Sequence, residues 1–359
     1  MSINTENIII TNSFSNCYLC DSKGVTLYSG LVDRLYGVPG DWDMIKCSNS
    51  DCGLLWLEPM PKIEDIPELY KKYYTHTISK PMPTYLNNIY ERIREGVLAS
   101  YFGYKEATNS MVWLILGRIL GLFPLLRERI GGTVMWLKAS QRGRLLEVGC
   151  GGGKQLQRLH KLGWNVVGIE PDNEAAGFVR TNFGLDVRSC SLEEAKLPDA
   201  SFDVIIMHHV IEHLYDPLKT LRECERILQK KGLLVVVTPN AMSSGIKRYG
   251  QDWRGFEVPR HLHLFTPRAF KYAIIDAGFL VKSMKTLVSR GGLVWINSDS
   301  IRKDRHCKMI GQKVGGTSKR RSETAKRWLK LFRYQVFQSI LLWSNSNSGE
   351  EILVVARKP

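Results

Sequence analysis

The stretch LLEVGCGGGK, residues 145–154, decides the fold. Its apolar beginning, Leu145 to Val148, predicts a buried strand of a parallel sheet, and the glycines that follow predict a tight turn into a helix from Gln155. Glycine lets the backbone adopt conformations that other residues avoid, and it lets the chain pass close to a ligand. We therefore expect a nucleotide-type binding loop at the carboxyl edge of a parallel sheet.

Two kinds of ligand compete for this loop. The dinucleotide pattern G-x-G-x-x-G of an NAD-dependent oxidoreductase fits Gly149 and Gly151, but Lys154 stands at its third glycine. The pattern of a methyl-donor site, an acid followed by alternating glycines, is complete. It comprises Glu147, Gly149, Gly151 and Gly153. Glu170 ends the next predicted strand about 20 residues further on, where a carboxylate can accept the ribose hydroxyls of a nucleoside.

Strand and helix patterns alternate from residue 142 to 289, which predicts an α/β fold with a doubly wound, mostly parallel sheet. The predicted strands are Arg144–Gly149, Asn165–Pro171, Leu185–Cys190, Phe202–His209, Gly232–Pro239, Leu280–Ser289 and Glu351–Arg357. We expect five parts in the chain. They are a ribbon-like domain (1–60), a helical linker or lid (61–140), the α/β core (141–289), a basic helical insertion (290–350) and the final core strand (351–359).

Four of the eight cysteines lie in the first sixty residues, as two pairs. Cys17 and Cys20 form a C-x-x-C knuckle, and Cys47 and Cys52 form a wider pair. Two turn-borne pairs of this kind can converge on one tetrahedral zinc ion, and four thiolates with no open position indicate a structural site. Four unrelated reduced thiols remain the alternative.

The net charge of +15 indicates an anionic partner, such as an acidic substrate, a membrane surface or nucleic acid, unless the surface is basic throughout. Much of this charge lies in the insertion, whose second half predicts an aromatic-rich amphipathic helix. The basic residues are Arg302, Lys303, Arg305, Lys308, Lys313, Lys319, Arg320, Arg321, Lys326, Arg327, Lys330 and Arg333. We expect the apolar segment 111–126 to pack over the core as a lid or linker, with membrane binding as the alternative.

The beginning of the chain lacks a basic segment followed by an apolar core, and no apolar run reaches the ~18 residues of a spanning helix. We therefore expect a cytoplasmic protein, with a possible peripheral attachment to an anionic membrane surface through the basic insertion.

The block LPDASFDVIIMHHVIEHLYDPLKTLRECERILQKKGLLVVVTPN, residues 197–240, strongly resembles class I S-adenosylmethionine-dependent methyltransferases, in particular the group that includes the ubiquinone-biosynthesis O-methyltransferase. The phrases GLLWLEPMP (53–61) and PRHLHLFTPRAFKYAIIDAGF (259–279) resemble a subgroup with an N-terminal metal ribbon. The resemblance implies a seven-stranded Rossmann-like sheet that binds S-adenosylmethionine.

The same resemblance assigns roles around the donor. It places Glu147, Gly149, Gly151 and Gly153 at the methionine part and Glu170 at the ribose. Many relatives have an Asp near the adenine after the third strand, whereas this chain has Cys190, Ser191 and Leu192 there. We expect Ser191 or backbone groups to hold the adenine instead. The resemblance also places His208 in the lining of the donor pocket.

Methyl transfer to a hydroxyl requires alignment of donor and acceptor and removal of a proton, which suits a histidine. His209 and His261 are the leading candidates for the base, because both are expected at the carboxyl side of the sheet. Glu212 could orient a histidine or bind the acceptor, and His213 lies beside it. The plainer alternative is that Glu212 and His213 cap the following helix and that His263 is a packed core residue.

Three functions follow from these patterns. The first is O-methylation of a small molecule: a sugar, a glycan precursor or a secondary metabolite. The second is methylation of nucleic acid, in which the insertion and the ribbon would bind the backbone phosphates. The third is a membrane- or partner-binding protein with a degenerate methyltransferase core, against which the complete glycine loop and Glu170 argue.

Overall fold

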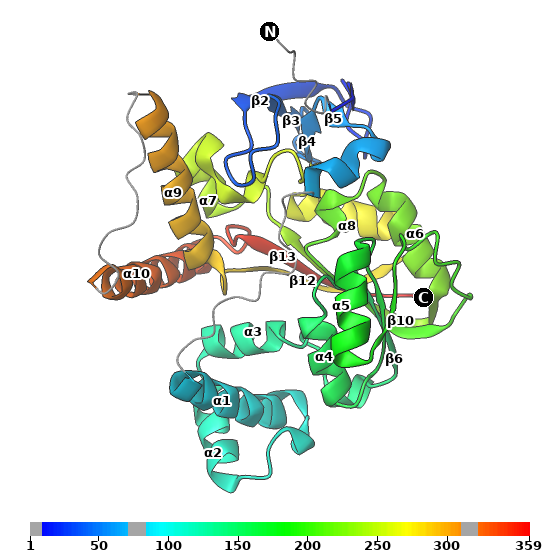
Figure 1. Cartoon of the computed structure of the whole chain (residues 1–359), viewed down its shortest axis with the longest axis vertical. Coiled ribbons are helices and arrows are strands. Elements are labelled where there is room, and N and C mark those ends of the chain that lie inside the picture. Colours follow the sequence, from blue (N-terminus) through cyan, green and yellow to red (C-terminus); the bar gives the residue numbers. More distant parts are fainter. Residues whose placement is uncertain (1–8, 71–83, 310–321) are drawn as a thin grey trace.

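The computed structural model describes residues 9–70, 84–309 and 322–359. Its centre is a seven-stranded sheet of order β12-β13-β10-β9-β6-β7-β8 (Figure 1). These strands are β6 (Arg144–Val148), β7 (Asn165–Ile169), β8 (Asp186–Arg188), β9 (Phe202–His208), β10 (Leu228–Pro239), β12 (Leu280–Leu287) and β13 (Glu351–Arg357). Only β13 runs antiparallel to its neighbours. All seven predicted strands are present, so the predicted fold class is confirmed, although β8 is shorter than expected and β10 begins four residues before Gly232.

Helices cover both faces of this sheet because its central strands carry apolar residues on both sides. Alternate residues of β6 enter two different cores: Leu145 packs with Leu156 of α4, whereas Leu146 packs in the core that contains Leu221 of α6 and Phe270 of α8. The covering helices are α4 (Lys154–Lys161), α5 (Asn173–Phe183), α6 (Pro217–Ile227) and α8 (Pro267–Asp276). The carboxyl ends of β6, β7 and β9 therefore lie side by side at one edge, where the site is built.

The N-terminal ribbon, residues 9–61, is joined to the core by a shared sheet. Its strands are β1 (Thr11–Asn12), β2 (Gly24–Leu31), β3 (Trp42–Cys47), β4 (Leu55–Glu58) and β5 (Met60–Pro61). The core contributes β11 (His263–Leu264), which pairs with β4 and completes a four-stranded sheet of order β11-β4-β3-β2. The sequence did not reveal this junction, because a two-residue strand leaves no periodic pattern.

The predicted helical segment forms a small lobe at the opposite end of the molecule from the ribbon (Figure 1). It contains α1 (Thr84–Phe102), α2 (Met111–Leu120) and α3 (Pro124–Gly132), with the 3-10 helix η1 (Ile63–Tyr70) before it. Residues of α1 and α3, such as Val97 and Ile130, share a core with α4. In contrast, α2 packs on α1, where Gly117 approaches Gly96 so closely that a Cβ there would lie 2.1 Å from the Gly96 carbonyl carbon. Residues 71–83 of the predicted helical segment lie outside the described residues.

The basic insertion forms two helices, α9 (Gly291–Met309) and α10 (Ser322–Ser344), and α9 packs against α7 (Ser244–Tyr249) and the loop that follows it. Two basic residues of the insertion contribute to this packing, since Arg302 and Arg305 form ion pairs with the buried Asp252. A second anchor is the buried Glu350 carboxylate, which accepts hydrogen bonds from Trp253 and Trp295. The side chains of Lys308, Lys313, Lys319, Arg320 and Arg321 lie outside the described residues. Within the described ranges, no helix is both long enough and apolar enough to cross a bilayer.

Candidate donor and acceptor sites

The glycine loop between β6 and α4 has the shape that the sequence predicts. Gly149 and Gly151 have φ angles of 67° and 49°, a left-handed region that other residues rarely adopt. A Cβ on Gly149 would lie 2.6 Å from Val210, so glycine is required there for packing. A Cβ on Gly151 would meet no atom within 4 Å, so this part of the loop faces open space. The loop thus forms a cradle that a ligand can approach closely.

Glu170, which directly follows β7, is hydrogen-bonded to this loop. Its Oε2 accepts a hydrogen bond from the Gly151 N–H at 2.7 Å, and its Oε1 accepts one from the Asp172 N–H at 3.0 Å. The side chain is nearly buried. These two bonds fix the orientation of the carboxylate at the edge of the cradle.

Glu147 lies beneath the loop and is buried. Burial and the nearby charge of Glu170 raise the pKa of Glu147 to about 8. Its Oε2 accepts no hydrogen bond within the described parts of the chain. A buried polar atom without a partner is uncommon in proteins and indicates a missing donor. A cation beside this carboxyl would lower its pKa and favour the carboxylate form. The unpartnered Glu147 oxygen, the open cradle and the fixed Glu170 therefore fit a cationic nucleoside such as S-adenosylmethionine.

The two remaining predicted donor contacts lie at the same edge of the sheet. Ser191 donates its hydroxyl proton to Glu194 at 2.8 Å, so toward a ligand it retains only an acceptor function. His208 ends β9, and its ring stacks edge-on against that of His209 at a centroid distance of 4.7 Å. Burial and the charge of His209 lower the pKa of His208 to about 3, so it is neutral at pH 7. The roles of Ser191 and His208 stay predictions.

His209 is held between two carboxylates. Its Nδ1 lies 3.0 Å from Glu212 Oε1 and its Nε2 lies 3.0 Å from Glu351 Oε1. Burial disfavours charge on this ring, but the two hydrogen bonds outweigh it and raise the pKa of His209 to about 10. Both nitrogens then donate and neither keeps a lone pair. This geometry does not favour His209 as the base and instead makes it a fixed positive charge. Glu351 was missed, because it lies 142 residues away and no local pattern pairs it with His209.

The two histidine motifs of the sequence meet at Glu212, His213 and His261. One side-chain ligand atom from each lies within 4.8 Å of the other two. Glu212 is completely buried and His261 is buried. The cluster is positioned by the 3-10 helix η4 (Ile211–His213) and by the segment before β11. The sequence placed both motifs at the carboxyl side of the sheet, and the structure brings them together.

Hydrogen bonds orient the rings of both histidines. His261 Nδ1 lies 2.7 Å from the Gly255 carbonyl, and His213 Nδ1 lies 3.0 Å from the Arg260 carbonyl and 3.0 Å from the Tyr70 hydroxyl. A carbonyl only accepts, so in a neutral His261 ring Nδ1 donates and Nε2 carries the lone pair. Burial and His213 lower the pKa of His261 to about 4, so its ring is neutral at pH 7. Two such imidazoles beside a carboxylate can take up a proton or bind a divalent cation.

The plainer assignment of these residues is correct only in part. The helix after the first motif, α6, is capped by Asp216, which accepts from the Lys219 N–H, and not by Glu212 or His213. His263, in contrast, is a packed core residue: it is buried, its Nδ1 donates to the Leu214 carbonyl, and its ring lies against Tyr18.

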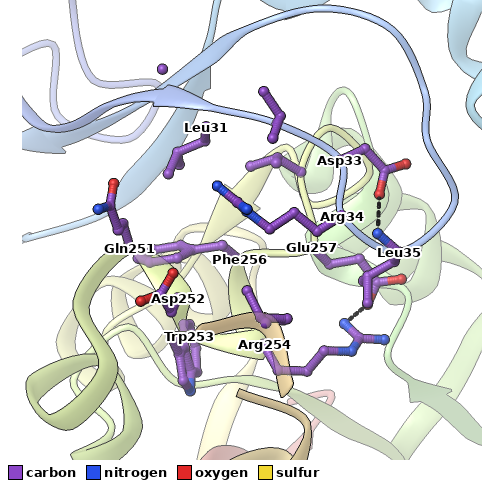
Figure 2. A pocket seen from close by; sticks show the side chains of 14 residues that line it. Leu31, Asp33, Arg34, Leu35, Gln251, Asp252, Trp253, Arg254, Phe256 and Glu257 are labelled. Carbon is purple, nitrogen blue, oxygen red and sulfur yellow. Dashed lines mark hydrogen bonds and ion pairs between the residues drawn. The ribbon is translucent and has the colours of Figure 1, made fainter. Parts of the chain in front are cut away.

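A small pocket opens beside the cluster, between the ribbon segment 30–35 and the core segment 251–258 (Figure 2). Its walls carry Arg34, Asp252, Arg254 and Glu257, and its cavity volume is about 40 Å³. Glu257 links the pocket to the cluster, because its Oε2 lies 3.7 Å from His261 Nε2. A cavity of this size and polarity holds a small polar group of a ligand and not a whole nucleotide. Neither Arg34 nor Glu257 was predicted from the sequence.

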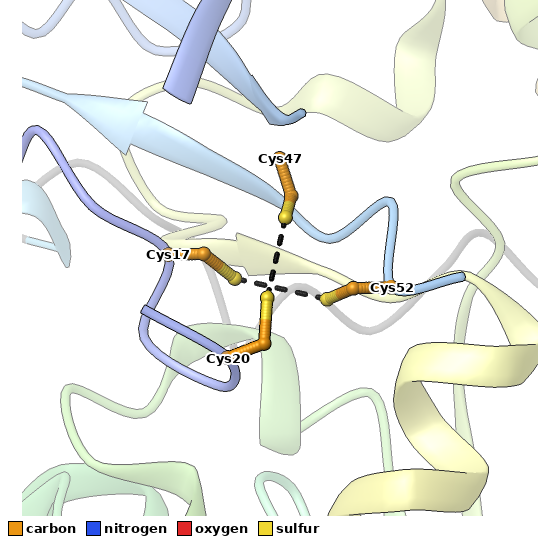
Figure 3. Close-up of side chains that lie close together, drawn as sticks. All are labelled: Cys17, Cys20, Cys47 and Cys52. Atoms are coloured by element: carbon orange, nitrogen blue, oxygen red, sulfur yellow. Dashed lines mark hydrogen bonds between the residues drawn. The ribbon is translucent and has the colours of Figure 1, made fainter. Parts of the chain in front are cut away.

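The four ribbon cysteines converge as predicted (Figure 3). The Sγ atoms of Cys17 and Cys52 are 3.7 Å apart, and those of Cys20 and Cys47 are 3.4 Å apart. Four sulfurs bound at 2.3 Å to one tetrahedral zinc ion lie about 3.8 Å from one another. The cluster is tied to the core, because Thr266 Oγ1 donates to the Cys52 carbonyl at 2.6 Å.

Comparison with known proteins supports a methyltransferase domain in this chain. Residues 124–283 match the model of a methyltransferase domain family. A probable S-adenosylmethionine-dependent methyltransferase of Mycobacterium tuberculosis is 35% identical over 141 residues, which cover 39% of this chain and 50% of that relative. The ubiquinone biosynthesis O-methyltransferase of Cereibacter sphaeroides (strain ATCC 17025) is 32% identical over 127 residues, 33% of this chain and 51% of the relative. The chain thus spans about half the length of the curated relatives it matches.

A solved methyltransferase from Archaeoglobus fulgidus is 18% identical and covers 69% of this chain and 100% of its own, with a TM-score of 0.41. This likeness is weak, and the strand order and the family match define the fold. The family match also favours a methyl donor over a dinucleotide at the glycine loop. The α/β domain of this chain thus matches a methyltransferase domain family, and the relatives it resembles are named as S-adenosylmethionine-dependent methyltransferases.

Proposed function

We propose that this protein transfers a methyl group from S-adenosylmethionine to a hydroxyl of a small molecule, such as a sugar, a glycan precursor or a secondary metabolite. The observation that carries the proposal is the closeness of the proton-accepting cluster to the donor loop. Val210 packs against Gly149 of that loop, and Glu212 follows two residues later. The donor loop, which follows β6, and Glu212, which follows β9, thus lie at the ends of two neighbouring strands.

On the donor side, the proposal gives each residue one task. The glycine loop and Glu170 bind the nucleoside. The unpartnered Oε2 of Glu147 interacts with the positive charge of the methionine part. The bound donor supplies a methyl group that its sulfonium has already activated. The protein therefore needs only to align the two reactants and to receive the proton.

On the acceptor side, the proposal makes His261 the base. The acceptor oxygen attacks the methyl carbon as the carbon–sulfur bond breaks, and the hydroxyl proton passes to His261 Nε2. Glu257 and Glu212, both buried carboxylates beside the ring, stabilise the imidazolium that forms. A neutral His261 with its Nδ1 proton on the Gly255 carbonyl is ready for this step. His209 acts as a positioning residue, because it orients Glu212.

The second part of the proposal is a structural zinc ion held by Cys17, Cys20, Cys47 and Cys52. The sulfur separations support it, as does the junction at β11, which continues the ribbon sheet from the cysteines toward His261. The ion would fix the ribbon, and the ribbon forms one wall of the pocket. In this proposal the metal has no part in the chemical step.

Nucleic acid is the less favoured acceptor. Arg302 and Arg305 of the basic insertion are engaged by Asp252 inside the protein, so they do not form a free phosphate-binding row. The pocket beside His261 also has room for only a small group.

The proposal is tested by incubating the full chain with radiolabelled donor and a panel of hydroxylated acceptors. Sugars, nucleotide-linked sugars, phenols and an oligonucleotide duplex form the panel. We expect label to enter a small hydroxylated acceptor and not the duplex. Transfer to the duplex alone would overturn the choice of acceptor, and absence of donor binding would overturn the activity itself.

A further inference from the structure

The most conspicuous surface outside the site is the outer face of α10. Trp343 is 95% exposed, Phe332 is 66% exposed, and five further apolar residues are exposed on the same helix. We call this set the α10 face. It comprises Trp328, Leu329, Phe332, Val336, Phe337, Ile340 and Trp343. At about 100° per residue, these positions occupy one half of the helix surface.

The other half of α10 is engaged with the protein. Gln338 is buried, Tyr334 donates a hydrogen bond to Asp299 of α9 at 2.8 Å, and Lys330 forms an ion pair with the same carboxylate at 2.7 Å. The helix is therefore anchored on its inner side while large apolar and aromatic side chains face solvent. Exposed patches of this kind mark interaction surfaces.

A basic edge borders the α10 face. Lys326, Arg327 and Arg333 are exposed, and at about 100° per residue Lys326 and Arg333 lie toward one margin of the apolar half, between Ile340 and Phe337. From residue 324 to 344 the sequence contains no Asp or Glu. An apolar face with tryptophan and phenylalanine, bordered by cations only, is the composition of a helix that lies in the interface of an anionic membrane.

We infer that α10 docks on an anionic lipid membrane, with its apolar face in the interface and its basic edge on the lipid phosphates. A second copy of the chain fits this surface less well, because a symmetric contact would bring the same basic edges together. In the proposed contact α10 lies in the plane of the membrane interface. Helix α2 presents a similar outer face, with Met111, Ile115 and Ile119 more than half exposed. The inference does not depend on methyl transfer.

Sedimentation of the full chain with lipid vesicles tests this inference. We expect binding to vesicles of phosphatidylcholine mixed with phosphatidylglycerol, little binding to phosphatidylcholine alone, and release by salt. Phe332→Glu and Ile340→Glu place a charge in the α10 face, and each should weaken binding by about tenfold or more. Ile275→Glu on α8 is the matched control, because Ile275 is 53% exposed but lies outside the face, and it should bind as the wild type does.

A second readout locates the contact. Brominated lipids should quench the fluorescence of wild-type protein more strongly than that of Trp343→Phe, since Trp343 is the most exposed residue of the face. Unchanged binding by both glutamate variants would overturn the inference. Failure of the wild-type protein to bind anionic vesicles would also overturn it. This holds if the protein is a monomer, and equally if it is a dimer that Phe332→Glu dissociates.

Discussion

Asp33 and Arg260 form a bidentate ion pair across the junction of the ribbon and the core. Arg260 donates from its two terminal nitrogens to the two Asp33 oxygens at 2.8 and 3.0 Å, and both side chains are fully buried. The residues are 227 positions apart in the chain. Arg260 directly precedes His261, so the pair connects the ribbon to the proposed base. The Arg260 guanidinium also keeps the pKa of Asp33 low despite the opposing effect of burial.

Removing one partner of this pair should be costly. In Asp33→Asn the buried Arg260 loses its bidentate partner and keeps the charge of Glu257, whose Oε1 lies 3.5 Å from Arg260 Nε. Loss of one partner of a buried ion pair typically lowers the free energy of unfolding by about 3–5 kcal/mol, and the remaining Glu257 places the expected loss at the lower end. Urea denaturation of wild type and variant measures the change. Asp51→Asn is the matched control, because Asp51 also pairs with a core arginine, Arg268, but both side chains are mostly exposed. The control should change little, and equal effects of the two variants would contradict the structural role of the buried pair.

Zinc analysis should find about one ion per chain in the purified protein, as expected for four thiolates around one tetrahedral centre. Cys20→Ser should lower the zinc content and the melting temperature together, because the ribbon sheet continues into β11 of the core. Cys190→Ser, at a partly buried cysteine outside the ribbon, should keep the zinc. A wild type without zinc, with all four ribbon thiols open to alkylation in the folded state, would refute the site.

The charge on His209 should appear as a pH dependence of stability. Its pKa rises from 6.5 to about 10 on folding, so the folded state binds this proton more tightly. The stabilisation is then fully present below pH 6.5 and is lost as the pH rises toward 10. Unfolding free energies of wild type and His209→Asn, measured across this range, should converge as the pH increases. A difference that stays constant from pH 6.5 to 10 would show that His209 is not held as an imidazolium.

His261→Asn should abolish most turnover and leave donor binding unchanged. Asn cannot accept the proton, and loss of a general base commonly lowers kcat by about 10²–10⁴-fold. The measurement compares initial rates with an acceptor found in the labelled-donor screen and donor affinity by calorimetry. His160→Asn, at an exposed histidine of α4, is the control and should retain full activity. If His261→Asn also keeps wild-type turnover, the base lies elsewhere.

The sequence predicted those features that rest on local pattern. The apolar runs of β6 and β9 and the glycine turn have clear signatures, and the two histidine motifs could be placed together because the carboxyl ends of parallel strands share one edge. The four cysteines were predicted from their spacing alone.

Long-range polar partnerships could not be predicted in this way. Glu351, Asp33 and Glu257 determine the charge and position of His209, Arg260 and His261, but each is an isolated acid in the sequence. Nothing local distinguishes such a residue from a solvated one. For the same reason, the sequence could not show that His209 is a fixed cation and not the base. That assignment depends on its contacts with Glu212 and Glu351.

Calorimetric titration of the full chain with S-adenosylmethionine tests the central claim most directly. We expect one donor site per chain and a Kd raised by about tenfold or more in Glu170→Gln, because the ribose loses a charged acceptor. Asp186→Asn, an exposed acid at the start of β8, should bind as the wild type does. Absence of binding to the wild type, or equal affinity of wild type and Glu170→Gln, would contradict the account.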